Sequence, residues 1–128
     1  MSINVFVNPS ETIDLVLYAY EKEKETVFTF DESTIPPDSE VEQLEFSFRK
    51  PDHKASNYIT SNSLSVNSVG EASIDSSKMQ DALFKTLLIK WNLKENGKIP
   101  EITNSRIDSL QPNLVRTVAI ELMGKVSI

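Results

Sequence analysis

The first fifty residues follow a pattern of apolar and polar positions that predicts β-strands. In LEFSFRK (residues 44–50) the apolar residues at positions 44, 46 and 48 alternate with polar residues at positions 45, 47 and 49, as in a strand that buries one face. Two earlier stretches, residues 13–20 and 26–30, are rich in β-branched and aromatic side chains, which favour strands. Residues 1–50 are therefore expected to form an antiparallel sheet of about three strands with one face covered.

Polar segments separate these predicted strands. The charged sequence EKEKE (residues 21–25) contains neither Gly nor Pro, and we expect it either to close a hairpin or to lie on the surface of a bent strand. Residues 31–40 contain two prolines and no apolar period, which predicts a loop.

The composition changes in the middle of the chain. Residues 51–77 are rich in Ser and Asn, and their apolar residues keep no sustained period, which predicts a loop or a mobile arm. The sequence LSVNSV (residues 64–69) alternates, so an additional edge strand is the alternative for that part.

Helical spacing begins after this polar segment. Asp75 or Ser76 is placed to cap a helix that runs through residues 77–93, because short polar side chains accept hydrogen bonds from the first free N–H groups of a helix. Spacings of three and four create two adjacent apolar stripes. One stripe consists of Met79, Leu83 and Leu87, and the other of Phe84, Leu88 and Trp91.

The end of the chain predicts a turn and two more helices. Asn96 and Gly97 tolerate the positive φ of a tight reversal, and Pro100 prevents the helix from continuing. Thr103 is placed to cap a short helix, and Pro112 suits the first position of the last helix. That helix is expected to stop at Gly124 and to turn Leu114, Val115, Val118, Ala119 and Leu122 inward.

These elements predict an α+β fold in a single domain spanning residues 1–128. A β-rich acidic part (1–50) is followed by the Ser/Asn-rich loop or arm (51–77) and by a helical hairpin or small helical bundle (78–128). A chain of 128 residues has the usual length for one hydrophobic core.

Charge is distributed unevenly along the chain. Residues 1–48 contain eleven Asp or Glu residues against Lys22 and Lys24, whereas residues 49–128 contain eight acids and eleven bases. Because the acidic first third repels a phosphate backbone, no nucleic-acid partner is expected. Either a basic protein partner or a solvated sheet face accounts for the acidity.

The sequence also bears on the compartment. The absence of cysteine excludes disulfides and thiolate metal sites, and it fits a reducing cytoplasm. Neither a signal-peptide pattern nor a long apolar run is present, so we expect a cytoplasmic protein with no membrane partner.

No combination of residues points to catalysis or to a cofactor. His53 is the single histidine, and Asp52 and Ser56 lie in the same short stretch, without the rigid scaffold that a nucleophilic triad needs. The acidic residues lack the spacing of a metal site, and three glycines cannot form a glycine-rich phosphate loop. We therefore expect a non-enzymatic protein without metal or cofactor.

Two features leave alternatives open. Trp91, at the end of an apolar stripe, is either a core anchor or an exposed hot spot for a partner. The basic residues Arg49, Lys50, His53 and Lys54 are either ordinary charges at the end of a strand or a binding patch.

The turn region also carries a resemblance to a known family. The sequence KWNL at the end of an apolar helix, Gly97 in a charged turn, IPEIT at residues 99–103, Ile107, and LQP before the final helix resemble the C-terminal part of the tail assembly chaperones of tailed bacteriophages. FSFRKP at residues 46–51 is similar to their N-terminal part, where a sheet leads into a proline-marked loop. The likeness lies mainly in residues 44–51 and 77–124.

This resemblance implies a non-enzymatic chaperone that binds the long helical tape measure protein, or other tail proteins, in the host cytoplasm. A groove for such a helix needs apolar side chains rimmed by charge. Apolar stripes that the sheet leaves free can supply that groove or bind a second copy in a homo-oligomer. The residues expected to contact a partner are Phe84, Leu88, Trp91, Leu114 and Val118.

Two other functions remain open. The acidic sheet region and the polar segment 51–77, in which the chain departs from the family, fit a structural virion protein of the baseplate, neck or capsid. A small acidic inhibitor of a host protein is the second alternative, with Glu40, Glu42 and Glu45 in its acidic face.

Overall fold

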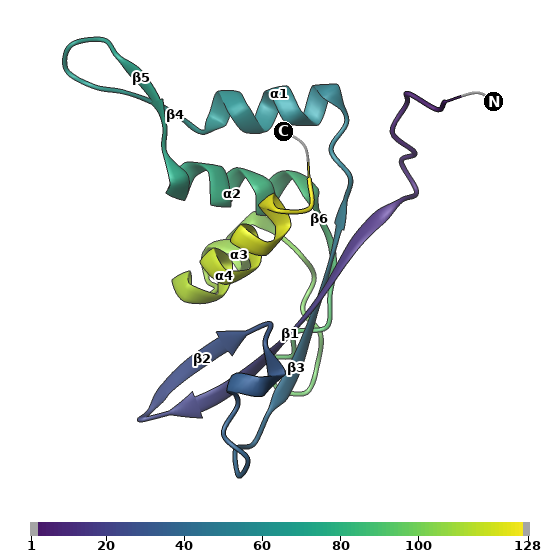
Figure 1. Cartoon of the computed structure of the whole chain (residues 1–128), viewed down its shortest axis with the longest axis vertical. Helices are drawn as coiled ribbons and strands as arrows, with labels where there is room; N and C mark the ends of the chain where they lie inside the picture. Colours follow the sequence, from purple (N-terminus) through teal and green to yellow (C-terminus); the bar gives the residue numbers. More distant parts are fainter. Residues whose placement is uncertain (1–2, 127–128) are drawn as a thin grey trace.

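The computed structural model describes residues 3–126 and has the expected α+β fold, with helices gathered on one side of an antiparallel sheet (Figure 1). The sheet consists of four strands in the order β2-β1-β3-β6, and a separate two-stranded sheet pairs β4 with β5. The elements in chain order are β1 (Thr12–Lys22), β2 (Glu25–Thr29), the 3-10 helix η1 (Glu32–Thr34), β3 (Glu42–Arg49), α1 (His53–Asn62), β4 (Leu64–Val66), β5 (Ala72–Ile74), α2 (Ser76–Leu87), β6 (Leu88–Trp91), α3 (Asn104–Asp108) and α4 (Pro112–Met123).

The three predicted N-terminal strands are confirmed as β1, β2 and β3. The segment EKEKE closes the β1–β2 hairpin, and its central residues Glu23 and Lys24 both have positive φ, at 53° and 68°. Such a two-residue turn matches the right-handed twist of the flanking strands. The predicted loop at residues 31–40 contains only the short helix η1.

The core lies between the sheet and the helices. Phe46 and Phe48 of β3 meet Phe84 of α2, and the three ring centroids are 5.4–6.4 Å apart. The ring of Phe84 stands edge-on to both rings of the sheet, a favourable geometry for aromatic pairs. Helix α2 packs against α1 and α4, and α4 also contacts β1 and β2.

The expectation of a loop or arm at residues 51–77 is wrong for most of that segment. Residues 53–62 form α1, whose Asp52 caps its start by accepting a hydrogen bond from the N–H of Ala55 at 2.8 Å. Ala55 and Ile59, four residues apart, are the buried residues of this helix. The alternating sequence LSVNSV does contribute a strand, β4, which pairs with β5 outside the main sheet.

The predicted helix over residues 77–93 is too long. Asp75 caps α2 as expected, but the helix ends at Leu87 and residues 88–91 form β6 at the edge of the sheet. The register between β3 and β6 shifts between Ser47 and Phe48. This bulge lets Leu88 and Trp91 both be buried, although a regular strand turns residues three apart to opposite faces.

The remaining C-terminal elements are confirmed. Asn96 and Gly97 have φ of 53° and 78° in a tight turn closed by Glu95 and Lys98. Thr103 caps α3, and Pro112 occupies the first turn of α4. The last helix ends at Met123, and Gly124 follows with an ordinary negative φ of −70°.

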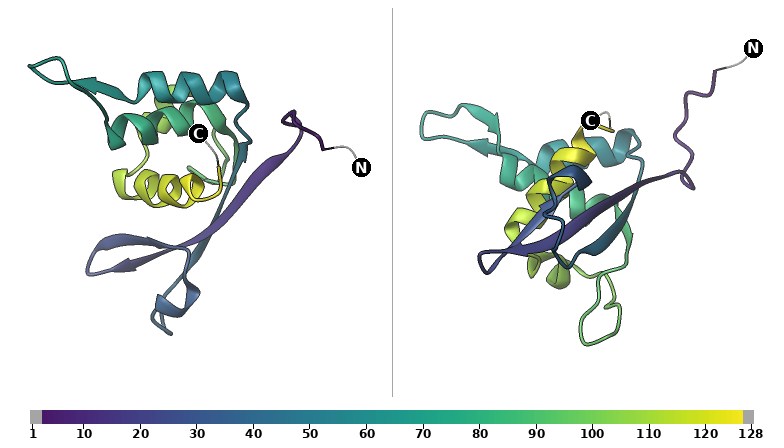
Figure 2. Two further views of the ribbon diagram at one scale, coloured as in Figure 1. Left: turned by 45° about the horizontal axis from the view of Figure 1, so that its top comes forward. Right: turned by 60° about the horizontal axis from the view of Figure 1, so that its bottom comes forward.

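Two parts of the chain extend away from this body. Residues 3–11, before β1, and the β4–β5 hairpin point away from opposite sides of the molecule in all three views (Figures 1 and 2). Both carry apolar side chains that are mostly exposed: Ile3, Val5 and Phe6 near the N-terminus, and Val66, Val69 and Ile74 in the hairpin.

Candidate protein-binding groove

All five residues predicted to contact a partner lie in the core. Phe84 and Val118 are fully buried, and Leu88, Trp91 and Leu114 are at most 9% exposed. The prediction that these side chains form an exposed binding surface is therefore wrong for the folded chain. Both apolar stripes of the predicted helix are used internally, because the sheet covers Phe84 and because Leu88 and Trp91 belong to β6 of that sheet.

Trp91 takes the core position that was one of its two alternatives. Its ring is only 5% exposed, and its indole Nε1–H donates a hydrogen bond to the carbonyl oxygen of Pro100 at 3.0 Å. A buried indole needs such an acceptor. The tryptophan therefore ties the Asn96-Gly97 turn segment to the edge of the sheet.

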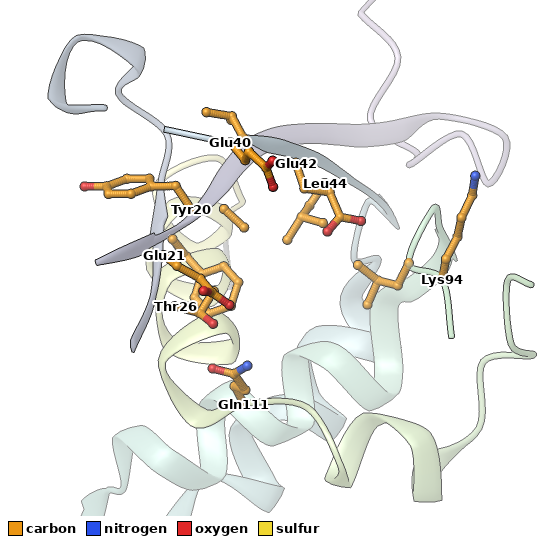
Figure 3. Close-up of a pocket in the computed structure, with 12 residues that line it drawn as sticks. Tyr20, Glu21, Thr26, Glu40, Glu42, Leu44, Lys94 and Gln111 are labelled. Atoms are coloured by element: carbon orange, nitrogen blue, oxygen red, sulfur yellow. The ribbon is translucent and has the colours of Figure 1, made fainter. Parts of the chain in front are cut away.

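One hollow that combines charged with apolar residues is a groove between the hairpin end of the sheet and the start of α4 (Figure 3). Its volume is about 580 Å³. Residues of β1, β2 and β3 form one side, and the segment after β6 and the residue before α4 form the other. The apolar residues in its lining are Ala19, Phe28, Val41, Leu44 and Leu93.

The rim of this groove is acidic. Glu21, Glu40 and Glu42 are exposed carboxylates around it, and Lys94 is the single cationic residue in its lining. Figure 3 shows Glu40 and Glu42 side by side on one wall, with Lys94 on another. The groove therefore carries a net negative formal charge at neutral pH, and apolar residues lie among the polar residues of its lining.

Two asparagines fix the walls of the groove. Asn92, directly after β6, accepts a hydrogen bond from the N–H of Glu45 at 2.7 Å and donates one to the carbonyl oxygen of Gln43 at 3.1 Å. Across the groove, the side-chain amide of Asn113 donates to the carbonyl oxygen of Thr26 at 3.1 Å. These bonds hold Leu93, which follows Asn92, and Gln111, two residues before Asn113, in place in the lining.

The third wall comes from the loop between β2 and β3. The hydroxyl of Tyr18 donates a hydrogen bond to the carboxylate of Glu32, and this bond raises the pKa of Tyr18 above its ordinary value. Asp31 accepts hydrogen bonds from the hydroxyl and the N–H of Ser33, which lower the pKa of Asp31. The loop is thus anchored on the outer face of β1 before it returns through Glu40 to β3.

Asp52 and His53, which lie close to Ser56 in the sequence, have structural roles. Asp52 caps α1, and the ring of His53 lies 3.2 Å from the side-chain amide of Asn57 on the same helix. Within residues 3–126, no three His, Cys, Asp or Glu side chains are grouped so as to hold a metal ion. None of the helices in that range is long and apolar enough to cross a bilayer.

Two members of the basic cluster make local contacts. Arg49 donates from Nε to the carbonyl oxygen of Thr86 at 3.2 Å, and Lys50 pairs with Glu11 at 2.7 Å. These contacts fit the alternative in which the cluster consists of charges at the end of a strand.

Sequence reasoning found part of this groove and missed the rest. Glu40 and Glu42 stand out in the sequence as an acidic run, whereas Glu45, grouped with them there, lines a different hollow on the outer face of the sheet. Leu93 and Gln111 belong to the KWNL and LQP motifs. Their convergence depends on the pairing of β6 with β3, which the expected long helix excluded.

Comparison with protein-family models, with curated protein sequences and with solved structures finds no match to this chain.

Proposed function

We propose that this chain is a non-enzymatic assembly protein of a tailed bacteriophage that binds a segment of the helical tape measure protein during tail morphogenesis. The observation that supports the proposal is the groove, whose lining combines apolar residues with an acidic rim. It offers a new location for the partner contact that the sequence assigned to residues of the core.

The volume of the groove can be compared with that of a helical turn. One turn of an α-helix with its side chains is a cylinder about 10–12 Å across and 5.4 Å long, or roughly 420–610 Å³. The groove volume of about 580 Å³ is comparable to that of one such turn. A helix-in-groove complex of this kind uses apolar anchors spaced three or four residues apart.

Charge selects among such helices. The carboxylates of Glu21, Glu40 and Glu42 favour a segment that carries Lys or Arg beside its apolar anchors, because complementary charge steers encounter and disfavours wrong partners. The proposed ligand is thus a cationic amphipathic helix, and binding takes place in the host cytoplasm before the tail is complete.

Binding of overlapping synthetic segments of the tape measure protein tests this proposal. We expect at least one cationic amphipathic segment to bind, and the double substitution Glu40→Lys with Glu42→Lys to weaken it at least ten-fold at low salt. The control variant Glu71→Lys changes an exposed acid outside the groove lining and leaves the affinity unchanged. Binding that is equally strong in all three proteins contradicts the proposal.

A second candidate, a structural virion protein, is favoured by a separate observation. The exposed apolar residues of the N-terminal segment and of the β4–β5 hairpin lie on opposite sides of the body (Figure 2), an arrangement that suits contacts with two neighbours. Quantitative mass spectrometry of purified particles separates the candidates. A fixed number of copies per particle supports the structural role, and absence from the particle supports the transient one.

A further inference from the structure

Half of one edge of β1 has no partner strand. β3 pairs with β1 from Thr12 to Ala19, but β2 pairs with the opposite edge of β1 only from Tyr18 to Lys22. No strand in the described part of the chain lies on the β2 side of residues 12–17. An exposed strand edge of this length is a template for another strand.

The hairpin register shows which backbone groups face this open edge. Lys22 and Glu25 flank the two-residue turn and form the closing pair of the hairpin, so alternate residues from Lys22 backwards point their N–H and C=O groups toward β2. Continued past the end of β2, the same alternation applies to Thr12, Asp14 and Val16. Their N–H and C=O groups therefore face the unpaired side.

The N-terminal segment, defined here as residues 3–7, has the composition of the missing strand. Its sequence INVFV alternates Ile3, Val5 and Val7 with Asn4 and Phe6, and β-branched and aromatic residues favour strands. Ile3, Val5 and Phe6 are 82%, 79% and 83% exposed. These side chains contribute nothing to the core of their own chain.

The segment is directed away from the edge of its own β1. A turn at its base is fixed by the hydrogen bond from Glu11 N–H to Asn8 C=O at 3.1 Å, and Asn8 Oδ1 also accepts from the N–H and the hydroxyl of Ser10. The ion pair between Glu11 and Lys50 at 2.7 Å joins this turn to the end of β3. Figure 1 shows the chain continuing outward from there, beyond the end of the sheet.

We propose that the N-terminal segment of a second copy of this chain binds as a strand to the open edge of β1 at residues 12–17. With the segment running parallel to β1, pairing odd positions with odd positions places Val5 beside Leu15 on the helix-covered face and Phe6 beside Val16 on the outer face. The apolar residues of the segment then continue the apolar inner face of the sheet. A shift by one residue reverses both faces, so the pattern selects the register.

Reciprocal exchange gives enough contact for a stable dimer. A Phe side chain alone removes roughly 150–250 Å² from water, and two segments with two edges bury on the order of 1,000–1,500 Å², at the lower end of stable interfaces. This proposal shares one assumption with the structural virion role, namely that the N-terminal segment contacts a neighbouring protein, and it specifies that this neighbour is another copy of the chain. It makes no use of the acidic groove, so a negative result here leaves the helix-binding proposal standing.

Sedimentation velocity of the purified full-length protein over a range of concentrations tests the exchange. The wild type is expected to dimerise, and Phe6→Asp is expected to weaken dimerisation at least ten-fold without loss of folding, because Phe6 is exposed in the single chain. The matched control Val69→Asp changes an equally exposed apolar residue, 74% exposed, in the other projection. A wild type that stays monomeric, or a control that dissociates the dimer as much as Phe6→Asp, overturns the proposal.

Disulfide trapping distinguishes strand exchange between two copies from a hairpin within one chain. Because the sequence contains no native cysteine, a disulfide can form only between introduced cysteines. Equal amounts of Phe6→Cys and Val16→Cys are mixed and oxidised, and a crosslinked dimer containing one of each variant is expected. A double variant that crosslinks only within its own chain overturns the proposal in favour of a self-folded hairpin. Failure of the mixture to crosslink overturns it too.

Discussion

Phe84 and Phe6 show two different uses of the same side chain. The ring of Phe84 is fully buried between Phe46, Phe48 and the neighbouring helices, whereas the ring of Phe6 is 83% exposed in a segment that leaves the body. Burial of apolar surface drives folding in the first case. In the second, the apolar surface is left for an encounter with another chain.

The same contrast holds between the body and the projections as a whole. The five apolar residues first expected to bind a tail protein, Phe84, Leu88, Trp91, Leu114 and Val118, all belong to the body and are buried in the core. The N-terminal segment and the β4–β5 hairpin, by contrast, carry apolar residues that remain mostly exposed. Amphipathic spacing identifies the apolar faces of a helix. Only the three-dimensional structure shows which of these faces the sheet or another helix covers and which remain exposed.

The matched substitutions Phe84→Ala and Phe6→Ala give the largest expected difference. Phe84→Ala removes a ring from the core and leaves a cavity, which lowers the free energy of unfolding by about 3–5 kcal/mol. Phe6→Ala changes it by less than about 0.5 kcal/mol when measured on dilute protein. Urea denaturation followed by circular dichroism checks both, and equal effects contradict the division into body and projections.

Trp91→Phe tests the edge of the body. Phe retains most of the apolar volume but cannot donate the hydrogen bond that the indole Nε1 makes to Pro100. The carbonyl oxygen of Pro100 then has no hydrogen-bond donor, which costs about 1–3 kcal/mol of stability. The segment that contains the Asn96-Gly97 turn is expected to become more mobile. Thermal denaturation measures the loss, and amide exchange near residue 100 locates it. An unchanged melting temperature contradicts this role of Trp91.

Asp52→Ala tests whether α1 belongs to the stable body. The substitution removes the hydrogen bond to the N–H of Ala55 at the start of the helix, and loss of such a cap typically costs about 1 kcal/mol. The nearby Lys54→Ala, which leaves the cap in place, serves as the control in the same urea titration. If both variants match the wild type, residues 53–62 contribute nothing to the cooperative unit.

Asp75 predicts a smaller, pH-dependent effect at the junction of the β4–β5 hairpin with α2. The N–H of Lys78 donates to its carboxylate at 3.0 Å and lowers the pKa of Asp75 below its ordinary value of 3.8. Since the folded pKa is the lower one, the stabilisation is complete above pH 3.8 and is lost as the pH falls through the folded pKa. Asp75→Asn keeps an acceptor that does not titrate.

The measurement is therefore the difference in stability between wild type and Asp75→Asn from pH 6 to pH 2. The advantage of the wild type is expected to shrink as the pH falls below 3.8. A difference that grows on acidification has the wrong sign and contradicts the role of the charged cap.

Local signals predicted most of the fold, and the failures have physical causes. Alternation marked β3, and Pro112 and Thr103 marked the starts of two helices, because these signals act within a few residues of the structure they specify. Helix α1 carried a valid signal, Asp52 followed by Ala55 and Ile59, that its polar composition obscured. The conversion of residues 88–91 to a strand has no local signal, since neither Gly nor Pro ends α2 and pairing with β3 outweighs helical propensity.

The groove was accessible to sequence reasoning only in part. Glu40 and Glu42 of its acidic rim stand out as charges in the sequence. The positions of Leu93 and Gln111 in its lining, however, depend on long-range hydrogen bonds made by Asn92 and Asn113. Such bonds join residues far apart in sequence, and no pattern within one segment indicates them.

Residue-resolved hydrogen exchange along β1 tests most directly whether the exposed apolar surface serves a second copy. In dilute protein, the amides of Ile13, Leu15 and Leu17 are expected to be protected while those of Thr12, Asp14 and Val16 exchange freely. In concentrated protein the amides of Asp14 and Val16, together with those of Val5 and Val7 in the bound segment, are expected to become protected as well. Even-numbered amides that are protected at every concentration, or at none, would contradict the account.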